Sequence, residues 1–189
     1  MARHTVLEGV MPWDRAHTRI VVGVLLTVLA GSSLLASEPA ELEPLAFLVG
    51  EWPGPGGGQP GVASGSAVFA RGLQDRVIVR TSYAEYPATA GRPASRHDDL
   101  MIIYATPEGG VRADYYDNEG HVIRYVVQSP APGRAVFLSE PVGGQPSFRL
   151  SYALDAAGVL KGEFAIAPPG APDAFKQYLS WESRKAGGR

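Results

Sequence analysis

The chain has 189 residues, of which 45% are hydrophobic and 19% are charged, and its formal net charge is −2 at pH 7. This balance excludes a disordered polar chain, and the lack of a Lys/Arg cluster argues against a nucleic-acid partner. The absence of cysteine excludes disulfides, thiol catalysis and zinc–thiolate sites. The 23 glycines and 16 prolines favour short strands and turns over long helices.

An apolar run near the N-terminus, Ile20–Ala30, follows basic residues and precedes small ones. This order is typical of a secretory signal peptide, with cleavage after Ala30 or Ala36. The alternative is a transmembrane anchor, but the apolar stretch is shorter than the roughly 20 residues that a spanning helix needs. We therefore expect removal of residues 1–36, export to the periplasm or medium, and no stable membrane anchor afterwards. Met11 is a second possible start, because the residues before it add nothing to the signal.

The segment 37–48 leads into the domain and contains a predicted helical turn over 41–48. Its apolar side chains would pack on one side of that turn. They are Leu42, Leu45, Phe47 and Leu48.

From residue 49 the chain is a series of strand-length runs separated by turn residues. The runs lie at roughly 49–55, 63–71, 75–86, 97–105, 110–117, 121–128, 133–140, 147–154, 159–167 and 174–184. Short strands at even spacing favour a sandwich or a barrel. Strands do not alternate with helices in this sequence, so a parallel sheet is not expected. We expect an all-β, antiparallel, up-and-down closed barrel of about ten strands over 49–185, with a tail at 186–189.

The clearest turn lies between Asp117 and His121, with the sequence Asp-Asn-Glu-Gly-His. Three loop residues that end in glycine fit a type I turn followed by a left-handed residue. This register pairs Asp117 with His121. The preceding turn would then place Asp99 opposite Asp117, and Met101 opposite Tyr115. Because side chains alternate along a strand, the register also separates an interior face of the sheet from a solvent-facing one.

The interior face is predicted to be apolar, with an acidic pair and a histidine at its end, at one mouth of the barrel. Its apolar residues are Met101, Ile103, Val111, Ala113, Tyr115, Ile123, Tyr125 and Val127, and the mouth residues are Asp99, Asp117 and His121. The solvent-facing side holds Tyr104, Arg112, Asp114 and Arg124.

Residues 45–52, LAFLVGEW, resemble the entry to a calycin-type barrel, in which Gly-x-Trp opens the first strand. With ten strands, the chain over 41–185 resembles the nitrobindin-like and related bacterial calycin-like proteins, in the superfamily of lipocalins and fatty-acid-binding proteins. The resemblance implies structural roles for Gly50 and Trp52, and a basic residue of the last strand, Arg184, that covers Trp52. Nitrobindin-like proteins hold haem through a late histidine, but the last predicted strand has none, so we expect no haem or other cofactor.

The leading hypothesis is a barrel that binds a small, largely apolar molecule in its interior. The predicted ligand contacts are Asp99, Met101, Tyr115, Asp117, His121, Tyr125 and Tyr152. One alternative is an enzyme that uses Asp117 and His121 as an acid/base pair. A metal site with mixed nitrogen and oxygen ligands is conceivable at the same place, although we expect no metal. A structural or partner-binding domain is the remaining alternative, in which the pair ties down the hairpin. The sequence leaves the oligomeric state open.

Overall fold

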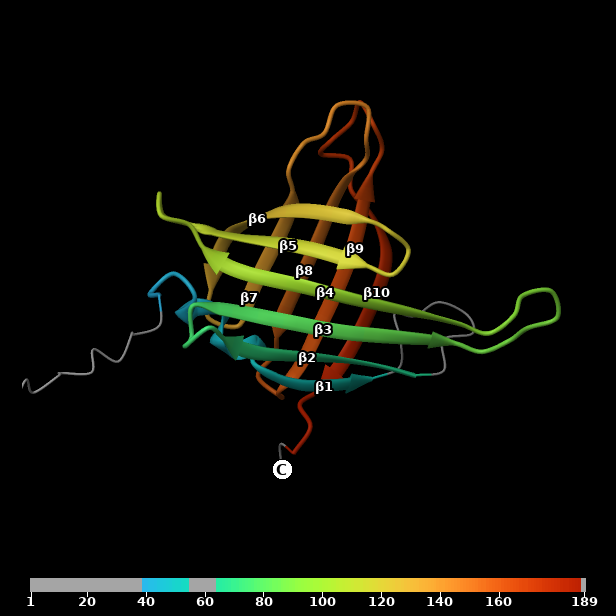
Figure 1. Ribbon diagram of the computed structural model, residues 1–189, viewed down its shortest axis with the longest axis horizontal. Helices are drawn as coiled ribbons and strands as arrows, with labels where there is room; N and C mark the ends of the chain where they lie inside the picture. The colour runs from blue at the N-terminus through green and yellow to red at the C-terminus, as the bar shows by residue number, and fades with distance from the viewer. Residues whose placement is uncertain (1–38, 55–63, 188–189) are drawn as a thin grey trace, which may run out of the picture. The chain divides into compact units, whose positions relative to one another are not determined.

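The computed structural model of the protein describes residues 39–54 and 64–187, and the predicted signal segment lies outside them. Ten antiparallel strands follow one another in a single sheet, so that each strand pairs with its neighbours in the chain. The sheet curls into a nearly closed barrel, with β2–β5 running across the front and β8–β10 behind them (Figure 1). The predicted all-β, up-and-down architecture is thereby confirmed.

The ten strands correspond one to one with the ten predicted runs. They are β1 (Gly50–Gly54), β2 (Ser64–Gly72), β3 (Val77–Tyr86), β4 (Ser95–Ala105), β5 (Val111–Asp117), β6 (Val122–Ala131), β7 (Arg134–Ser139), β8 (Ser147–Leu154), β9 (Val159–Ala167) and β10 (Lys176–Arg184). The main difference lies at the end of β6, where two prolines predicted a turn. The strand instead continues to Ala131 through an irregular register after Gln128, and such irregularities are where a strand accommodates proline.

No helix among the described residues is long and apolar enough to cross a membrane.

The barrel is joined at the seam between its first and last strands. Ser183 Oγ donates to the carbonyl oxygen of Pro53 at 2.5 Å, and the backbone N–H of Ala186 donates to the carbonyl oxygen of Glu51 at 2.8 Å. The seam has no continuous ladder among the described residues, whereas each of the other neighbouring pairs does. The cylinder is therefore nearly, not fully, closed.

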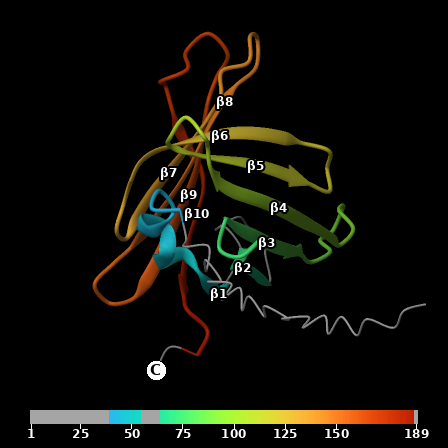
Figure 2. The same ribbon diagram turned by 60° about the vertical axis from the view of Figure 1, so that its left-hand side comes forward.

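The predicted helical turn is a 3-10 helix, η1 (Glu43–Leu48), which lies against β6 and β7 at one end of the barrel (Figure 2). A 3-10 helix has three residues per turn, so side chains three apart share a face. Leu42, Leu45 and Leu48 accordingly are all fully buried, while Phe47 is only partly buried. Trp52 Nε1 donates to the carbonyl oxygen of Leu48 at 2.7 Å, which fixes η1 to β1.

The register of the central hairpin is confirmed. Asp99 pairs with Asp117 and Met101 with Tyr115, while the Asp117 N–H donates to the His121 carbonyl oxygen at 3.3 Å. The glycine before His121 has a φ of 90°, as the predicted turn requires.

The predicted interior face of the barrel is also confirmed for most of its residues. Six of its members are buried: Met101, Ile103, Val111, Ala113, Tyr125 and Val127. Tyr115 and Ile123 lie nearer the mouth and are partly buried. On the opposite face Arg112 and Arg124 are exposed.

The cation over Trp52 is Lys185, not Arg184. Lys185 Nζ lies 5.9 Å from the centre of the Trp52 ring, whereas Arg184 Nη1 donates to the Ala157 carbonyl oxygen at 2.7 Å. Adjacent strand residues point to opposite faces, so an error of one position exchanges the two cations. Gly50 has a φ of 141°, a conformation that side chains rarely adopt, which explains the glycine.

Candidate functional site

A cavity of about 190 Å³, partly open to solvent, lies within the barrel. Aromatic rings dominate its wall: Trp52, Tyr115, Tyr125, Tyr152, Phe164 and Trp181. Its polar lining comes mainly from β3 and β4, through Arg80, Ser82, His97 and Asp99. An apolar cavity of about 150 Å³ holds benzene in another protein, so this one has room for a single substituted ring.

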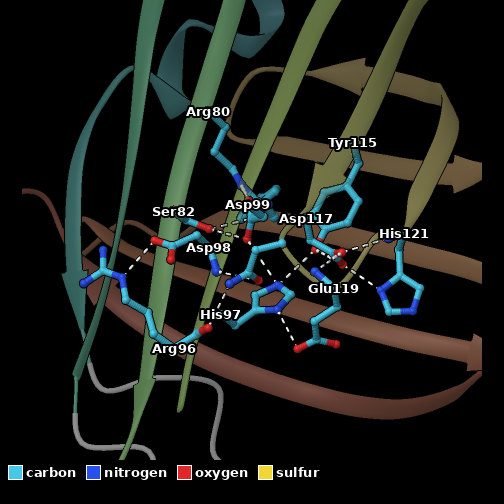
Figure 3. A network of polar contacts seen from close by, with 12 residues as sticks. Arg80, Ser82, Arg96, His97, Asp98, Asp99, Tyr115, Asp117, Glu119 and His121 are labelled. Carbon is cyan, nitrogen blue, oxygen red and sulfur yellow. Dashed lines mark hydrogen bonds and ion pairs between the residues drawn. The ribbon is translucent and has the colours of Figure 1, made fainter.

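Arg80 is the buried centre of the polar lining, with 7% of its surface exposed (Figure 3). Its Nε and Nη2 donate to Asp99 Oδ1 at 3.2 and 2.5 Å, and its Nη1 donates to the Tyr152 hydroxyl at 2.7 Å. Ser82 Oγ donates to the other carboxylate oxygen, Asp99 Oδ2, at 2.6 Å. The Asp99 carboxylate thus balances the charge of Arg80, and both of its oxygens accept hydrogen bonds.

The pKa values in this cluster follow from burial and from that ion pair. Burial alone would lower the pKa of Arg80, but Tyr152 and Asp99 raise it above its ordinary value. Burial raises the pKa of Tyr115 and of Tyr152, although Arg80 opposes the change in both. The arginine therefore stays charged and both phenols stay protonated.

His97 connects this cluster to the mouth of the barrel. Its Nε2 lies 3.1 Å from the Tyr115 hydroxyl and 3.8 Å from Asp99 Oδ2, and its Nδ1 lies 3.2 Å from Glu119 Oε1. The Tyr115 hydroxyl also donates to Asp117 Oδ2 at 3.3 Å. A continuous row of polar side chains thus runs from the interior to the rim (Figure 3).

The predicted Asp117–His121 pair exists, but it lies at the rim. His121 Nδ1 is 2.8 Å from Asp117 Oδ2, and Asp117 Oδ1 accepts the backbone N–H groups of Glu119 and His121 at 3.0 and 2.9 Å. The carboxylate side chain is only 3% exposed, whereas the imidazole is 63% exposed. These contacts hold the hairpin in its conformation.

This arrangement makes Asp117 a source of stability that depends on pH. Burial would raise the pKa of Asp117, but hydrogen bonds from the backbone and side chain of His121 lower it below the usual value. A lowered folded-state pKa means that the contribution is present above the unfolded pKa, near pH 4, and is lost as pH falls through the folded one.

We therefore expect Asp117→Asn to cost about 1 kcal/mol at pH 7 and to flatten the loss of stability below about pH 4. Urea unfolding between pH 2.5 and 7 measures this, with Asp173→Asn, on an exposed turn, as the control. Parallel curves for Asp117→Asn and the unmodified protein would contradict it.

Of the seven predicted ligand contacts, four line the cavity: Asp99, Tyr115, Tyr125 and Tyr152. Asp117 and His121 are not part of the lining and reach it only through Tyr115. Met101 does not line the cavity either. It is fully buried in the hydrophobic core of the barrel.

The predicted ligand contacts did not include Arg80, Ser82 or His97, all three of which line the cavity. The signal was available in part: Arg80 pairs with Met101, and Ser82 with Asp99, so both share the predicted interior face. The loop between β3 and β4 was too long to fix that register from the sequence. Trp181 was also missed as a lining residue.

Among the residues that the structure describes, no group of three or more His, Asp or Glu side chains is arranged to hold a metal ion. No protein-family model matches the sequence, and the search of curated proteins finds no match.

Proposed function

We propose that this protein is an exported, calycin-like barrel that binds a small, largely apolar molecule in its interior cavity. The main support for this proposal is the cavity itself. It has a volume of about 190 Å³, and aromatic rings line it, with a compact polar cluster on one side. Ligand sites are mostly apolar with a few placed polar groups, and this lining has that composition. Export and the calycin likeness rest on the N-terminal pattern and on the Gly-x-Trp entry.

Two features favour binding over the alternatives. A general base must reach the substrate, but Asp117 and His121 lie outside the cavity lining. A purely structural interior would be close-packed, since protein cores leave few voids larger than a water molecule. The space beside Arg80 and Trp181 is larger than that.

Native mass spectrometry of the protein purified from a host that exports it tests the proposal. We expect a reproducible extra mass that is lost on denaturation. A clean, unliganded mass from several hosts and growth conditions would count against a binding barrel.

A pair of variants on β2 tests whether the extra mass occupies the cavity. Ala67 lines the cavity, and Val68, the next residue, is 39% exposed on the outer face. We expect Ala67→Phe to abolish the extra mass, because a phenyl ring fills most of the space, and Val68→Phe to leave it unchanged. Equal retention in both variants would place the ligand elsewhere.

A further inference from the structure

The Tyr125 hydroxyl is an unused hydrogen-bond donor inside the barrel. Tyr125 lines the cavity and is only 2% exposed, yet its hydroxyl makes no hydrogen bond with any part of the chain that the structure describes. The hydroxyl oxygen is not sealed inside the core but reaches the cavity, so its proton is available to a molecule bound there.

Tyr152 supplies a second donor close by. Its oxygen accepts the Arg80 Nη1–H at 2.7 Å, which leaves its own proton without an acceptor among the described residues. Both rings lie edge-on to Phe137, with centroids 6.2 and 6.1 Å away. Burial raises the pKa of Tyr125; Arg80 opposes this rise and Tyr152 adds to it. The Tyr125 hydroxyl therefore keeps its proton.

The charge of the cluster is already balanced before any ligand arrives. Arg80 is paired with Asp99 at 2.5 Å, and Ser82 satisfies the second carboxylate oxygen. A ligand carboxylate would place a second negative charge next to Asp99 in a buried site, which is costly unless it gains its own cation. An uncharged acceptor carries no such cost.

We propose that the cavity selects an uncharged, compact ligand with a carbonyl oxygen, to which the Tyr125 and Tyr152 hydroxyls donate. This rests on the proposed function and adds the ligand's chemistry to it. A carbonyl oxygen has two lone pairs and can accept both protons, while the aromatic wall takes the apolar remainder. The cavity volume limits that remainder to about one ring with a short substituent.

Three probes of nearly the same shape separate the possibilities: acetophenone, α-methylstyrene, which replaces the carbonyl oxygen by carbon, and benzoate at pH 7. Their dissociation constants are measured by ligand-observed NMR titration of the protein. We expect acetophenone to bind about fivefold to tenfold tighter than either of the other two, as one or two net hydrogen bonds predict.

Tyr125→Phe assigns the effect to the hydroxyl. It should weaken acetophenone about threefold to tenfold and leave α-methylstyrene unchanged. Tyr116→Phe, with Tyr116 41% exposed on the outer face, is the matched control and should change neither. The unliganded Tyr125→Phe protein should stay within about 0.5 kcal/mol of the parent in urea, because the hydroxyl makes no hydrogen bond with the part of the chain that the structure describes.

The remaining outcomes overturn the proposal in distinguishable ways. Tightest binding of benzoate would make this a carboxylate site. Equal binding of acetophenone and α-methylstyrene, insensitive to Tyr125→Phe, would leave an apolar binding barrel without carbonyl recognition. Failure of all three probes up to their solubility limits would overturn the binding function as well.

Discussion

Arg80→Met is expected to destabilise the protein by about 3–5 kcal/mol, because it leaves the Asp99 carboxylate buried without its cation. The two side chains are 8% and 6% exposed and meet at 2.5 Å. Removing the arginine also leaves the Tyr152 hydroxyl without its donor. Urea unfolding at pH 7, followed by far-UV circular dichroism, measures the loss.

Two further variants show whether the buried charge is the cause. In Arg80→Met/Asp99→Leu no charge remains uncompensated, so at least half of the lost stability should return. Arg96→Met removes an arginine from β4 that pairs with Glu85 and Asp98 on the outer face, where all three side chains are about half exposed. We expect little effect there, since water replaces an exposed ion pair. A loss in Arg96→Met equal to that in Arg80→Met would contradict this account.

Much of the fold could be predicted because a few neighbouring residues determine the conformation of a turn. Gly120 and its neighbours specify a three-residue hairpin loop, and that loop alone fixes which β5 and β6 residues share a face. Alternation then propagates this assignment along each strand, so the burial of Met101 and Tyr125 followed from residues some distance away. At Arg184 and Lys185 the expected cation came from a family resemblance and no turn fixed the register, and there the expectation was wrong by one residue.

The site could be predicted only in part, because its central contact crosses the barrel. Arg80 and Tyr152 are 72 residues apart in the chain and meet only once the sheet has curled. Nothing local marks Arg80, because an arginine in a strand is usually a solvated one. Tyr152 was predicted as a ligand contact, but nothing in the sequence showed that Arg80 is its partner. The acidic pair and histidine were conspicuous in the sequence, yet the structure uses Asp117 and His121 at the rim.

Gly162→Ala should destabilise the protein by about 1–3 kcal/mol, because the added methyl group overpacks the space that Trp181 occupies. The backbone conformation of the strand at this position would itself tolerate alanine. Gly162 pairs with Trp181 across β9 and β10, and a Cβ on it would lie 2.1 Å from Trp181 Cε2. The indole lies over the glycine and forms part of the cavity wall, edge-on to Tyr152 at 6.0 Å. The variant should therefore also change the near-UV circular dichroism and weaken binding of any cavity ligand.

Gly143→Ala is the matched control, because a Cβ there meets nothing within 4 Å and no left-handed conformation is required. Its stability should stay within about 0.5 kcal/mol of the parent. Gly162→Ala/Trp181→Phe then identifies the clashing group: a phenyl ring is smaller than the indole, so the double variant should recover stability that Gly162→Ala loses. Without that recovery, the cost would lie in the β9 backbone, and Gly162 would not be the residue that makes room for this wall of the cavity.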